Sequence, residues 1–299
     1  MNSNKIIALQ FFSNLTGNVT KITFSKKGSS SVASIRLQLI PCIKAAKSRN
    51  LETEVWSLHS DKIDDQILTN KHLACIVGKL STHAHLQSSM YVANSSALSR
   101  FKDMDIPIIS IYSDNHARKG DLNGTLYRQI LNISSAIVCP THTLRQAAHQ
   151  FNTRANICVI EDPWQIQEMK KMRGKLDKFI RIVWFGSFLN WKYMSNMLTE
   201  TWKYLEPSKI YIFNILSAKT AVNMIKKDVI KSNPPFNVQI QIIEWSNFDQ
   251  PNQLEKILES SDIALVPSDP NDPAKQGVSH NRVVDAVRSG CVVIASPMP

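Results

Sequence analysis

Short apolar runs rich in β-branched residues alternate with amphipathic segments along most of the chain. This alternation predicts parallel strands, buried on both faces, that are connected by helices. Strands are predicted at residues 21–25, 54–58, 73–78, 107–112, 136–139 and 157–160, and again at 180–185, 210–215, 238–243, 263–267 and 291–295. The pattern therefore predicts an α/β fold with doubly wound parallel sheets, in which ligands lie beyond the carboxyl ends of the strands.

A charged and weakly periodic stretch, residues 164–178, interrupts this alternation. We interpret it as a linker between two domains, residues 1–163 and 179–299, each long enough to bury its own core. Helices are predicted at 34–48, where Pro41 interrupts the pattern, at 125–132, at 143–151 and after Lys192.

One stretch, residues 279–297, predicts a helix that leads directly into a buried strand. Ser279 or Asn281 can cap its start, because a short side-chain oxygen accepts from the first free N–H groups. Gly290 is suited to end the helix, and residues 291–295 form an unbroken apolar run typical of a strand buried on both faces.

The side chains of this helix separate into an apolar and a charged side. The apolar side carries Val283, Val284 and Val287, and the charged side carries Arg282, Asp285 and Arg288. A helix that starts at the carboxyl ends of strands presents free N–H groups and a positive dipole end to an anion. Asp285 lies about one turn further on, where a carboxylate could accept hydrogen bonds from a ribose. The stretch thus predicts a nucleotide site.

Composition narrows the class of protein without identifying a site. Of the 299 residues, 43% are hydrophobic and 20% are charged, and no apolar run reaches the roughly 18 residues of a membrane span. The start of the chain carries no export signal, so we expect a cytoplasmic protein. The five cysteines are far apart and lack metal-ligand spacing, which favours buried free thiols over disulfides or a zinc site.

The net charge of +11 favours anionic partners. Sugar nucleotides and acidic lipid headgroups fit, the latter by peripheral contact with the inner face of a membrane. Nucleic acid is ranked last, because no Arg-rich block and no interleaved aromatic stripe occur.

Further candidate residues follow the strands of the first domain. Asp114 and His116 come after the strand at 107–112, and His116 could act as a base on an acceptor hydroxyl. The same residues are equally explained by a turn with a solvated histidine. Lys79 follows another strand, and Arg36 opens a helix after a Ser-rich loop. Each of these two fits either an anion contact or a solvated surface position.

Two groups of residues resemble the second domain of GT-B glycosyltransferases, particularly the family-4-like enzymes. Asn281-Arg282, Asp285-Ala286, Gly290 and Ser296-Pro297 occupy the places of that family's late motif. Gly186 ends a strand, and Lys192 stands six residues beyond it, as in the family. Two positions depart from the pattern. Gly277, eight residues before Asp285, replaces the first acid of a Glu-x7-Glu pair, and Ser187 replaces an arginine.

The resemblance implies two Rossmann-like domains and transfer of a sugar from a nucleotide diphosphate donor to a glycan or a lipid-linked acceptor. It implies retention of anomeric configuration and no need for a metal or other cofactor. Lys192 and Arg282 would neutralise the leaving diphosphate, and Asp285 would orient the ribose. The remaining donor-side candidates are Gly186, Ser187, Trp245, Lys275, Ser279 and Asn281, and the acceptor-side candidates are Arg36, Lys79, Asp114 and His116. Trp245 fits a base-stacking position or an ordinary core position.

Two other functions fit the same residues. The departures at Gly277 and Ser187 fit a GT-B-shaped binding or scaffold protein without turnover, and a nucleotide-sugar epimerase shares the two-domain form. Because Pro299 follows directly on an apolar strand, we also expect that a further strand and helix, or a partner, cover this edge of the sheet.

Overall fold

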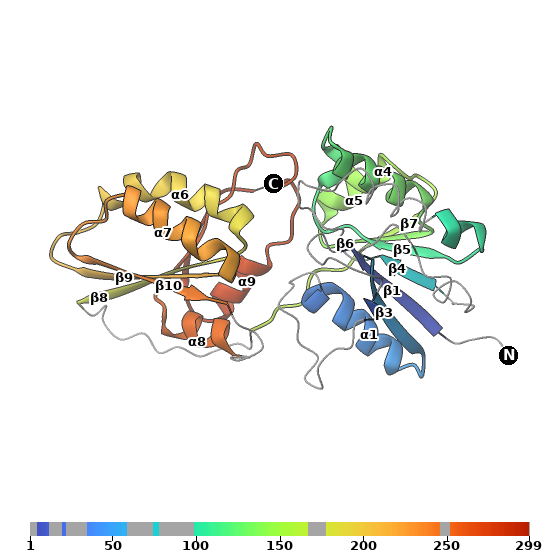
Figure 1. The fold of residues 1–299 in the computed structure, drawn as a ribbon, viewed down its shortest axis with the longest axis horizontal. Helices are drawn as coiled ribbons and strands as arrows, with labels where there is room; N and C mark the ends of the chain where they lie inside the picture. The colour runs from blue at the N-terminus through green and yellow to red at the C-terminus, as the bar shows by residue number, and fades with distance from the viewer. Residues whose placement is uncertain are drawn as a thin grey trace. The chain divides into compact units, whose positions relative to one another are not determined.

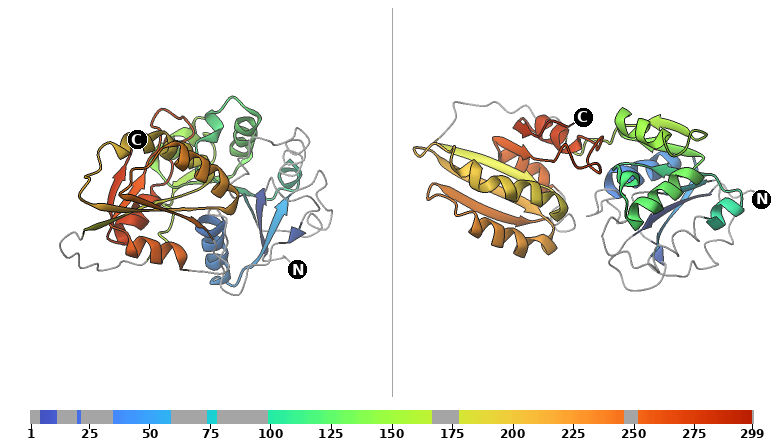
Figure 2. Two further views of the ribbon diagram at one scale, coloured as in Figure 1. Left: turned by 60° about the vertical axis from the view of Figure 1, so that its left-hand side comes forward. Right: turned by 90° about the horizontal axis from the view of Figure 1, so that it is seen from above.

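The computed structural model describes residues 5–11, 20–21, 35–58, 74–77, 99–166, 178–245 and 252–298. The chain forms two compact units. The first contains the chain up to Asp162 together with Asn271–Ser279, and the second contains Pro163–Pro270 and His280–Met298. Each unit is built on its own β-sheet with helices packed against it (Figures 1 and 2). Within the described ranges, no helix has the length and apolar composition that crossing a membrane requires.

The described strands of the first unit form a seven-stranded sheet in the order β2-β3-β1-β4-β5-β6-β7. They are β1 (Lys5–Phe11), β2 (Thr20–Lys21), β3 (Glu52–Leu58), β4 (Ala74–Val77), β5 (Ile108–Ile111), β6 (Ala136–Cys139) and β7 (Asn156–Val159). Neighbouring strands are parallel, except that β2 runs antiparallel to β3. The doubly wound α/β fold is thereby confirmed.

The beginning of this sheet differs from the prediction. The strand β1, which lies between β3 and β4, was not predicted, because a short apolar run so near the chain start has no flanking pattern to identify it. Of the predicted strand at 21–25, only Lys21 is described, and it belongs to β2.

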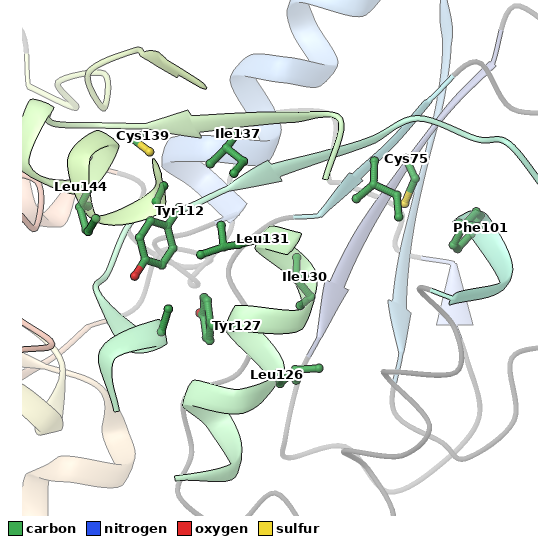
Figure 3. Close-up of a cluster of buried hydrophobic side chains, with 14 of the residues drawn as sticks. Cys75, Phe101, Tyr112, Leu126, Tyr127, Ile130, Leu131, Ile137, Cys139 and Leu144 are labelled. Carbon is green, nitrogen blue, oxygen red and sulfur yellow. The ribbon is translucent and has the colours of Figure 1, made fainter. Parts of the chain in front are cut away.

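The helices of the first unit are η1 (Ile35–Leu39), α1 (Ile40–Lys47), η2 (His116–Arg118), α4 (Leu122–Ile133) and α5 (His142–His149). Pro41 stands in the first turn of α1, directly after the π-helical turn η1, so the interruption predicted there is confirmed. Helices α4 and α5 pack on one face of the sheet, and α1 lies on the other (Figure 1). Figure 3 shows the core on the α4 side, where Tyr127, Ile130 and Leu131 of α4 pack against strand residues.

The second unit contains a five-stranded parallel sheet in the order β10-β9-β8-β11-β12. Its strands are β8 (Phe179–Phe185), β9 (Ile210–Ser217), β10 (Val238–Glu244), β11 (Ile263–Val266) and β12 (Val292–Ala295). Its helices are α6 (Phe188–Trp202), η3 (Lys219–Ala221), α7 (Val222–Lys231), α8 (Gln253–Ser260) and α9 (Asn281–Arg288).

The central strand β8 joins the two cores of this unit. Ile182 and Trp184 belong to the cluster that packs against α6 and α7, whereas Val183 and Phe185 belong to the cluster that includes residues of α8 and α9. Because successive side chains of a strand point to opposite faces, a continuous apolar run is required here. The Ile-Val-Trp-Phe sequence of β8 meets that requirement.

Two predictions about the end of this unit are wrong. The buried side of α9 carries Asp285 and Ala286, while Val287, which was predicted to be buried, is 57% exposed. The strand β12 lies at the edge of the sheet, and Val292 and Ile294 are exposed, so it is not buried on both faces.

The segment Asn271–Ser279, which connects β11 to α9, packs within the first unit. The hydroxyl of Thr141 donates to the carbonyl oxygen of Gly277 (2.6 Å), and the backbone N–H of Asn115 donates to that of Ala274 (3.3 Å). Gly277 has a φ of +79°, and a Cβ added to it would lie 2.9 Å from Cβ of Thr143. The segment is therefore fitted closely to the start of α5.

We predict that Gly277→Ala lowers the free energy of unfolding by about 1–3 kcal/mol, because the new Cβ meets Thr143 and the left-handed backbone disfavours any side chain. Gly120→Ala is the matched control, since a Cβ there meets nothing within 4 Å, and it should change stability by less than about 0.5 kcal/mol. Urea unfolding of both variants measures the difference. Equal stability of the two would contradict the close fit.

Candidate functional site

The carboxyl ends of the strands of the second unit are tied together by short hydrogen bonds. The hydroxyl of Ser217, at the end of β9, donates to the carbonyl oxygen of Gly186 (2.8 Å), directly after β8. The backbone N–H of Trp245 donates to the carbonyl oxygen of Ser217 (2.7 Å), and that of Ser268 to the hydroxyl of Ser296 (2.9 Å). This edge is therefore a connected platform at the place where parallel sheets bind ligands.

Gly186 leaves room on this platform for a guanidinium group. A Cβ added at Gly186 would lie 3.4 Å from Nη1 of Arg282 and 3.4 Å from the ring of Trp184. A Cβ at this position would be in van der Waals contact with both groups. Arg282, the second residue of α9, therefore lies directly beside the end of β8.

The guanidinium of Arg282 is held in an electrostatically costly place. Nη1 is buried and has no hydrogen-bond partner among the described residues. Burial lowers the pKa of Arg282 to about 10, so the group stays charged at neutral pH. A buried cation without a partner is expensive, and an anion that supplied hydrogen-bond acceptors would remove this cost.

Two helices begin beside this cation without side-chain caps. The N-cap residue of α9 is His280, which makes no capping hydrogen bond, so the prediction that Ser279 or Asn281 caps the helix is wrong. The N-cap of α6 is Ser187, whose side chain also makes no capping bond. The amide of Asn190 in α6 donates to the carbonyl oxygen of Ser187 (3.0 Å). Without a side-chain cap, the positive dipole end at each helix start favours negative charge. Since Ser187 adjoins Gly186, both helix starts flank the guanidinium of Arg282.

Asp285 is completely buried within this unit, with 0% of its surface exposed. Its Oδ1 accepts a hydrogen bond from the backbone N–H of Gln165 (2.8 Å), and its Oδ2 accepts one from Nε2 of the same residue (3.0 Å). A ribose contact, which the sequence motif predicts, would require the Gln165 side chain to leave. That contact stays a prediction.

Arg288, at the end of the same helix, holds the neighbouring residues of the connector. Its Nε donates to the carbonyl oxygen of Ile166 (2.9 Å), and its guanidinium carbon lies 4.5 Å from the ring centroid of Trp164. We call residues 164–166 together with Asp285 and Arg288 the connector clamp. The sequence offers no signal for it, because its partners are separated by 120 residues or more.

The remaining donor-side candidates of the second unit lie near the platform or on α6. Helix α6 begins at Phe188, earlier than predicted, so Lys192 stands in its second turn, exposed, with Nζ 4.6 Å from the ring centroid of Tyr193. Trp245 is partly buried and packs with the core cluster on the α8 side. Asn281 is the first residue of α9 and is partly buried.

Two donor-side candidates, Lys275 and Ser279, belong to the segment that packs within the first unit. Gly277, where the family places its first acid, lies in the same segment. The amide N–H of Lys275 donates to the carbonyl oxygen of Asp272 (2.8 Å), which forms a turn. At Gly277, where the family places an acid, the close contact with Thr143 leaves no room for a carboxylate side chain in this arrangement.

His116 and Asp114 of the first unit lie together. Nε2 of His116 is 3.7 Å from Oδ2 of Asp114, and the His116 ring is 4.9 Å from that of Tyr127. His116 is buried, so the solvated loop histidine that the sequence also allowed is wrong. Among the other acceptor-side candidates, Lys79 and the side chain of Arg36 lie outside the described residues.

No group of three or more His, Cys, Asp or Glu side chains that could hold a metal ion occurs in the described parts of the two units. The thiols have other surroundings. Burial raises the pKa of Cys139 to about 12, and it also raises the pKa of Cys75, so these two are protonated core residues.

The connector clamp predicts coupled effects on stability. Asp285→Asn should lower the free energy of unfolding by about 2–4 kcal/mol and Gln165→Ala by about 1–3 kcal/mol, because each leaves a buried polar group without its partner. The double variant should lose about 1 kcal/mol less than the sum of the two. Denaturant unfolding measures this cycle, with Gln150→Ala, an exposed glutamine, as the control. Strict additivity would mean that the two side chains do not interact.

Comparison with known proteins supports the fold and leaves the activity open. The sequence matches no model of a known protein family, and no curated protein is similar to it. Anabaena Alr3699/HepE, solved in complex with UDP and glucose, shares 12% identity and a TM-score of 0.59, with 98% of this chain and 81% of that chain covered.

Trehalose-6-phosphate synthase, studied with bisubstrate glycomimetics for glycosyl transfer with retention, shares 10% identity and a TM-score of 0.52 over 98% of this chain and 84% of that one. A structure described as trehalose-6-phosphate from E. coli bound with UDP-2-fluoro glucose gives 9% identity and a TM-score of 0.54, over 97% and 84% of the two chains. At these identities the similarity concerns the fold. The chain has the two-sheet α/β fold of GT-B glycosyltransferases.

Proposed function

We propose that this protein is a glycosyltransferase that takes a sugar from a nucleotide diphosphate donor, and that its second unit binds the donor. The observation that carries the proposal is the buried Nη1 of Arg282, which has no hydrogen-bond partner among the residues that the structure describes. This atom lies against Gly186, beside two helix starts without side-chain caps. A diphosphate supplies the negative charge and the acceptor oxygens that this place lacks.

The structural relatives are compatible with this proposal. Alr3699/HepE was solved with UDP and glucose, and trehalose-6-phosphate synthase was studied for transfer with retention. We therefore expect a uridine or similar nucleotide, a hexose, and retention of the anomeric configuration. The sequence motifs point to the same donor class, because Gly186 and Lys192 occupy two of the family's diphosphate positions and Asn281-Arg282 matches its late motif.

The proposed reaction breaks the bond between the anomeric carbon and the diphosphate oxygen, and the electron pair leaves with the diphosphate. Arg282, the amides at the starts of α6 and α9, and Lys192 would stabilise that developing charge, which is often the largest contribution to catalysis. These cations would do the work that a metal ion does in other enzymes. Because the family's arginine is replaced by Ser187, Arg282 would contribute a larger share of the stabilisation of the leaving diphosphate here.

The acceptor hydroxyl forms the new bond to the anomeric carbon and loses its proton. We assign this proton to His116, whose ring lies beside the carboxylate of Asp114, with Arg36 and Lys79 as further acceptor-side residues. Asn281, Ser279, Ser187 and Lys275 would contribute donor contacts, Trp245 would flank the base, and Asp285 would reach the ribose if Gln165 moves. The acceptor class is a glycan or a lipid-linked sugar, and the excess of basic residues suits an anionic surface.

A second candidate function is binding of a nucleotide sugar without turnover. Two observations favour it. The carboxylate of Asp285 is enclosed by Gln165, and Gly277 leaves no room for the acid that the family places there. Neither position of the family's acid pair presents a free carboxylate in this arrangement. A binding protein would keep the Arg282 site and lose only the chemistry.

Arg282→Met tests the donor site. It should remove the protection against heat that UDP gives to the wild type, because the diphosphate loses its buried cation. The variant without ligand should be as stable as the wild type or more stable by about 1–3 kcal/mol, since a buried, unpartnered charge is removed. Thermal melts with and without UDP measure both effects. Arg145→Met, an exposed arginine on α5, is the control, and equal UDP protection of both variants would refute the site.

Donor hydrolysis separates the two candidate functions. For an enzyme, UDP or GDP release from a panel of sugar nucleotides should fall by about tenfold to a thousandfold in Lys192→Ala, because one charge that stabilises the leaving group is lost. Lys256→Ala, an exposed lysine on α8, should leave the rate unchanged. Tight donor binding without release in the wild type would support the binding protein instead.

A further inference from the structure

The strands of the second sheet begin at one continuous edge, opposite to the edge that holds Arg282. The amide N–H of Ile210 donates to the carbonyl oxygen of Lys178 (3.1 Å), which joins the starts of β8 and β9. Nδ2 of Asn237, just before β10, donates to the carbonyl oxygens of Lys209 (2.9 Å) and Glu206 (3.2 Å). Nε1 of Trp202 donates to the hydroxyl of Ser232 (3.0 Å), which joins the ends of α6 and α7.

This edge carries the most exposed large apolar side chains of the described chain. Phe236 is 92% exposed, Tyr204 is 84% exposed and Ile230 is 77% exposed. Phe179, the first residue of β8, is also exposed. We call these four residues the amino-edge patch. Scattered apolar residues on a surface are ordinary, but four at one edge of a sheet require a reason. Two of them lie in turns, one in the last turn of α7 and one at the start of β8.

Lysines surround the amino-edge patch. Lys178, Lys203 and Lys231 are exposed, and Lys209 is partly exposed. Two acids share the region: Glu200 pairs with Lys203 (2.6 Å) and Glu206 with Lys209 (3.2 Å). The hydrogen bond from Ser208, followed by that from Lys209, lowers the pKa of Glu206 and favours its carboxylate form. Asp262, directly before β11 at the same edge, is a third acid, and its carboxylate accepts from the backbone N–H of Arg181 (2.8 Å). Lys178 and Lys231, which take no part in the two ion pairs, give the apolar patch its basic rim.

Two residues of the patch lie in turns at the sheet edge. Tyr204 lies in the turn that follows α6, and Phe236 lies in the turn before β10, next to Pro234 and Pro235. Figure 1 shows both connections at the end of the unit where the strands begin. Prolines limit the backbone conformations of such a turn. The turn therefore loses little conformational entropy when an exposed ring on it inserts into a binding partner.

We propose that the amino-edge patch docks this protein on an anionic lipid bilayer. Aromatic rings that are apolar at one end and can contact headgroups at the other suit the membrane interface, and lysines reach anionic headgroups from the rim. A peptide partner would be expected to meet a groove with paired polar groups, whereas these side chains stand on four separate elements: two turns, the last turn of α7 and the start of β8. The inference rests on the proposed function in one respect: a lipid-linked acceptor would be located in the membrane on which the protein docks.

Docking leaves the proposed donor site free. The patch lies where the strands begin, whereas Gly186 and Arg282 lie where they end, so one unit can contact a bilayer and bind a nucleotide at opposite edges of the same sheet. The lipid would contribute no donor contact. Binding to vesicles and protection by UDP are therefore independent measurements.

Sedimentation with sucrose-loaded vesicles tests the proposal. The wild type should bind vesicles that contain phosphatidylglycerol, bind phosphatidylcholine vesicles much more weakly, and be released by salt. Phe236→Ser with Tyr204→Ser should weaken binding to the anionic vesicles at least tenfold, because two inserted rings are lost. Lys231→Gln should weaken it about fivefold.

Met224→Ser, a change at the other end of α7, should bind like the wild type, and thermal melts should show all variants folded. Sedimentation velocity tests the rival occupant, a second copy of this chain. A dimer that Phe236→Ser dissociates, together with no binding to anionic vesicles, would overturn the proposal. Equal vesicle binding by wild type and the double variant would overturn it as well. If UDP protects every variant alike, failure of the docking leaves the donor site intact.

Discussion

The buried carboxylate of Asp285 is the interaction on which the second unit depends. A polar group without exposed surface must be matched by hydrogen bonds, and Gln165 supplies two of them from its backbone and its side chain. These bonds fix the path of the connector, residues 164–166, along α9. Arg288 fixes the residue after Gln165 in the same way, by donating to the carbonyl oxygen of Ile166. Because the helix is fixed by this match, its second residue, Arg282, lies against Gly186.

Arg282 and Asp285 belong to one helix but differ in whether their buried polar atoms have hydrogen-bond partners. Asp285 is matched within the protein, whereas Nη1 of Arg282 is buried without a partner. Proteins commonly retain such an unfavourable group where a ligand completes it, and stability is lower in the free form as a result. Asp285 is therefore a structural residue of α9, whereas Arg282 is the residue that we propose binds the ligand, although both belong to the same sequence motif.

The departures at Gly277 and Ser187 also have a structural setting. Gly277 turns the chain where the segment Asn271–Ser279 meets α5 in the first unit, and only a residue without Cβ fits there. Ser187 stands at the start of α6, next to the glycine that accommodates Arg282. One absent acid is explained by packing, and one absent arginine lies beside a buried arginine from another helix. The structure offers no further account of either replacement.

Much of the α/β architecture could be predicted from the sequence, because β-branched runs and glycine-terminated helices respond to local rules. The strands β5, β6, β8 and β9 and the position of Gly186 follow from such patterns. The central place of β1, the inward face of α9 and the packing of Asn271–Ser279 were decided by tertiary structure. An eight-residue helix has two plausible buried sides, and on the buried side the carboxyl of Asp285 is bonded by Gln165, 120 positions earlier. Local periodicity carries no information about such a partner, so the identity of the buried side had to come from the folded chain.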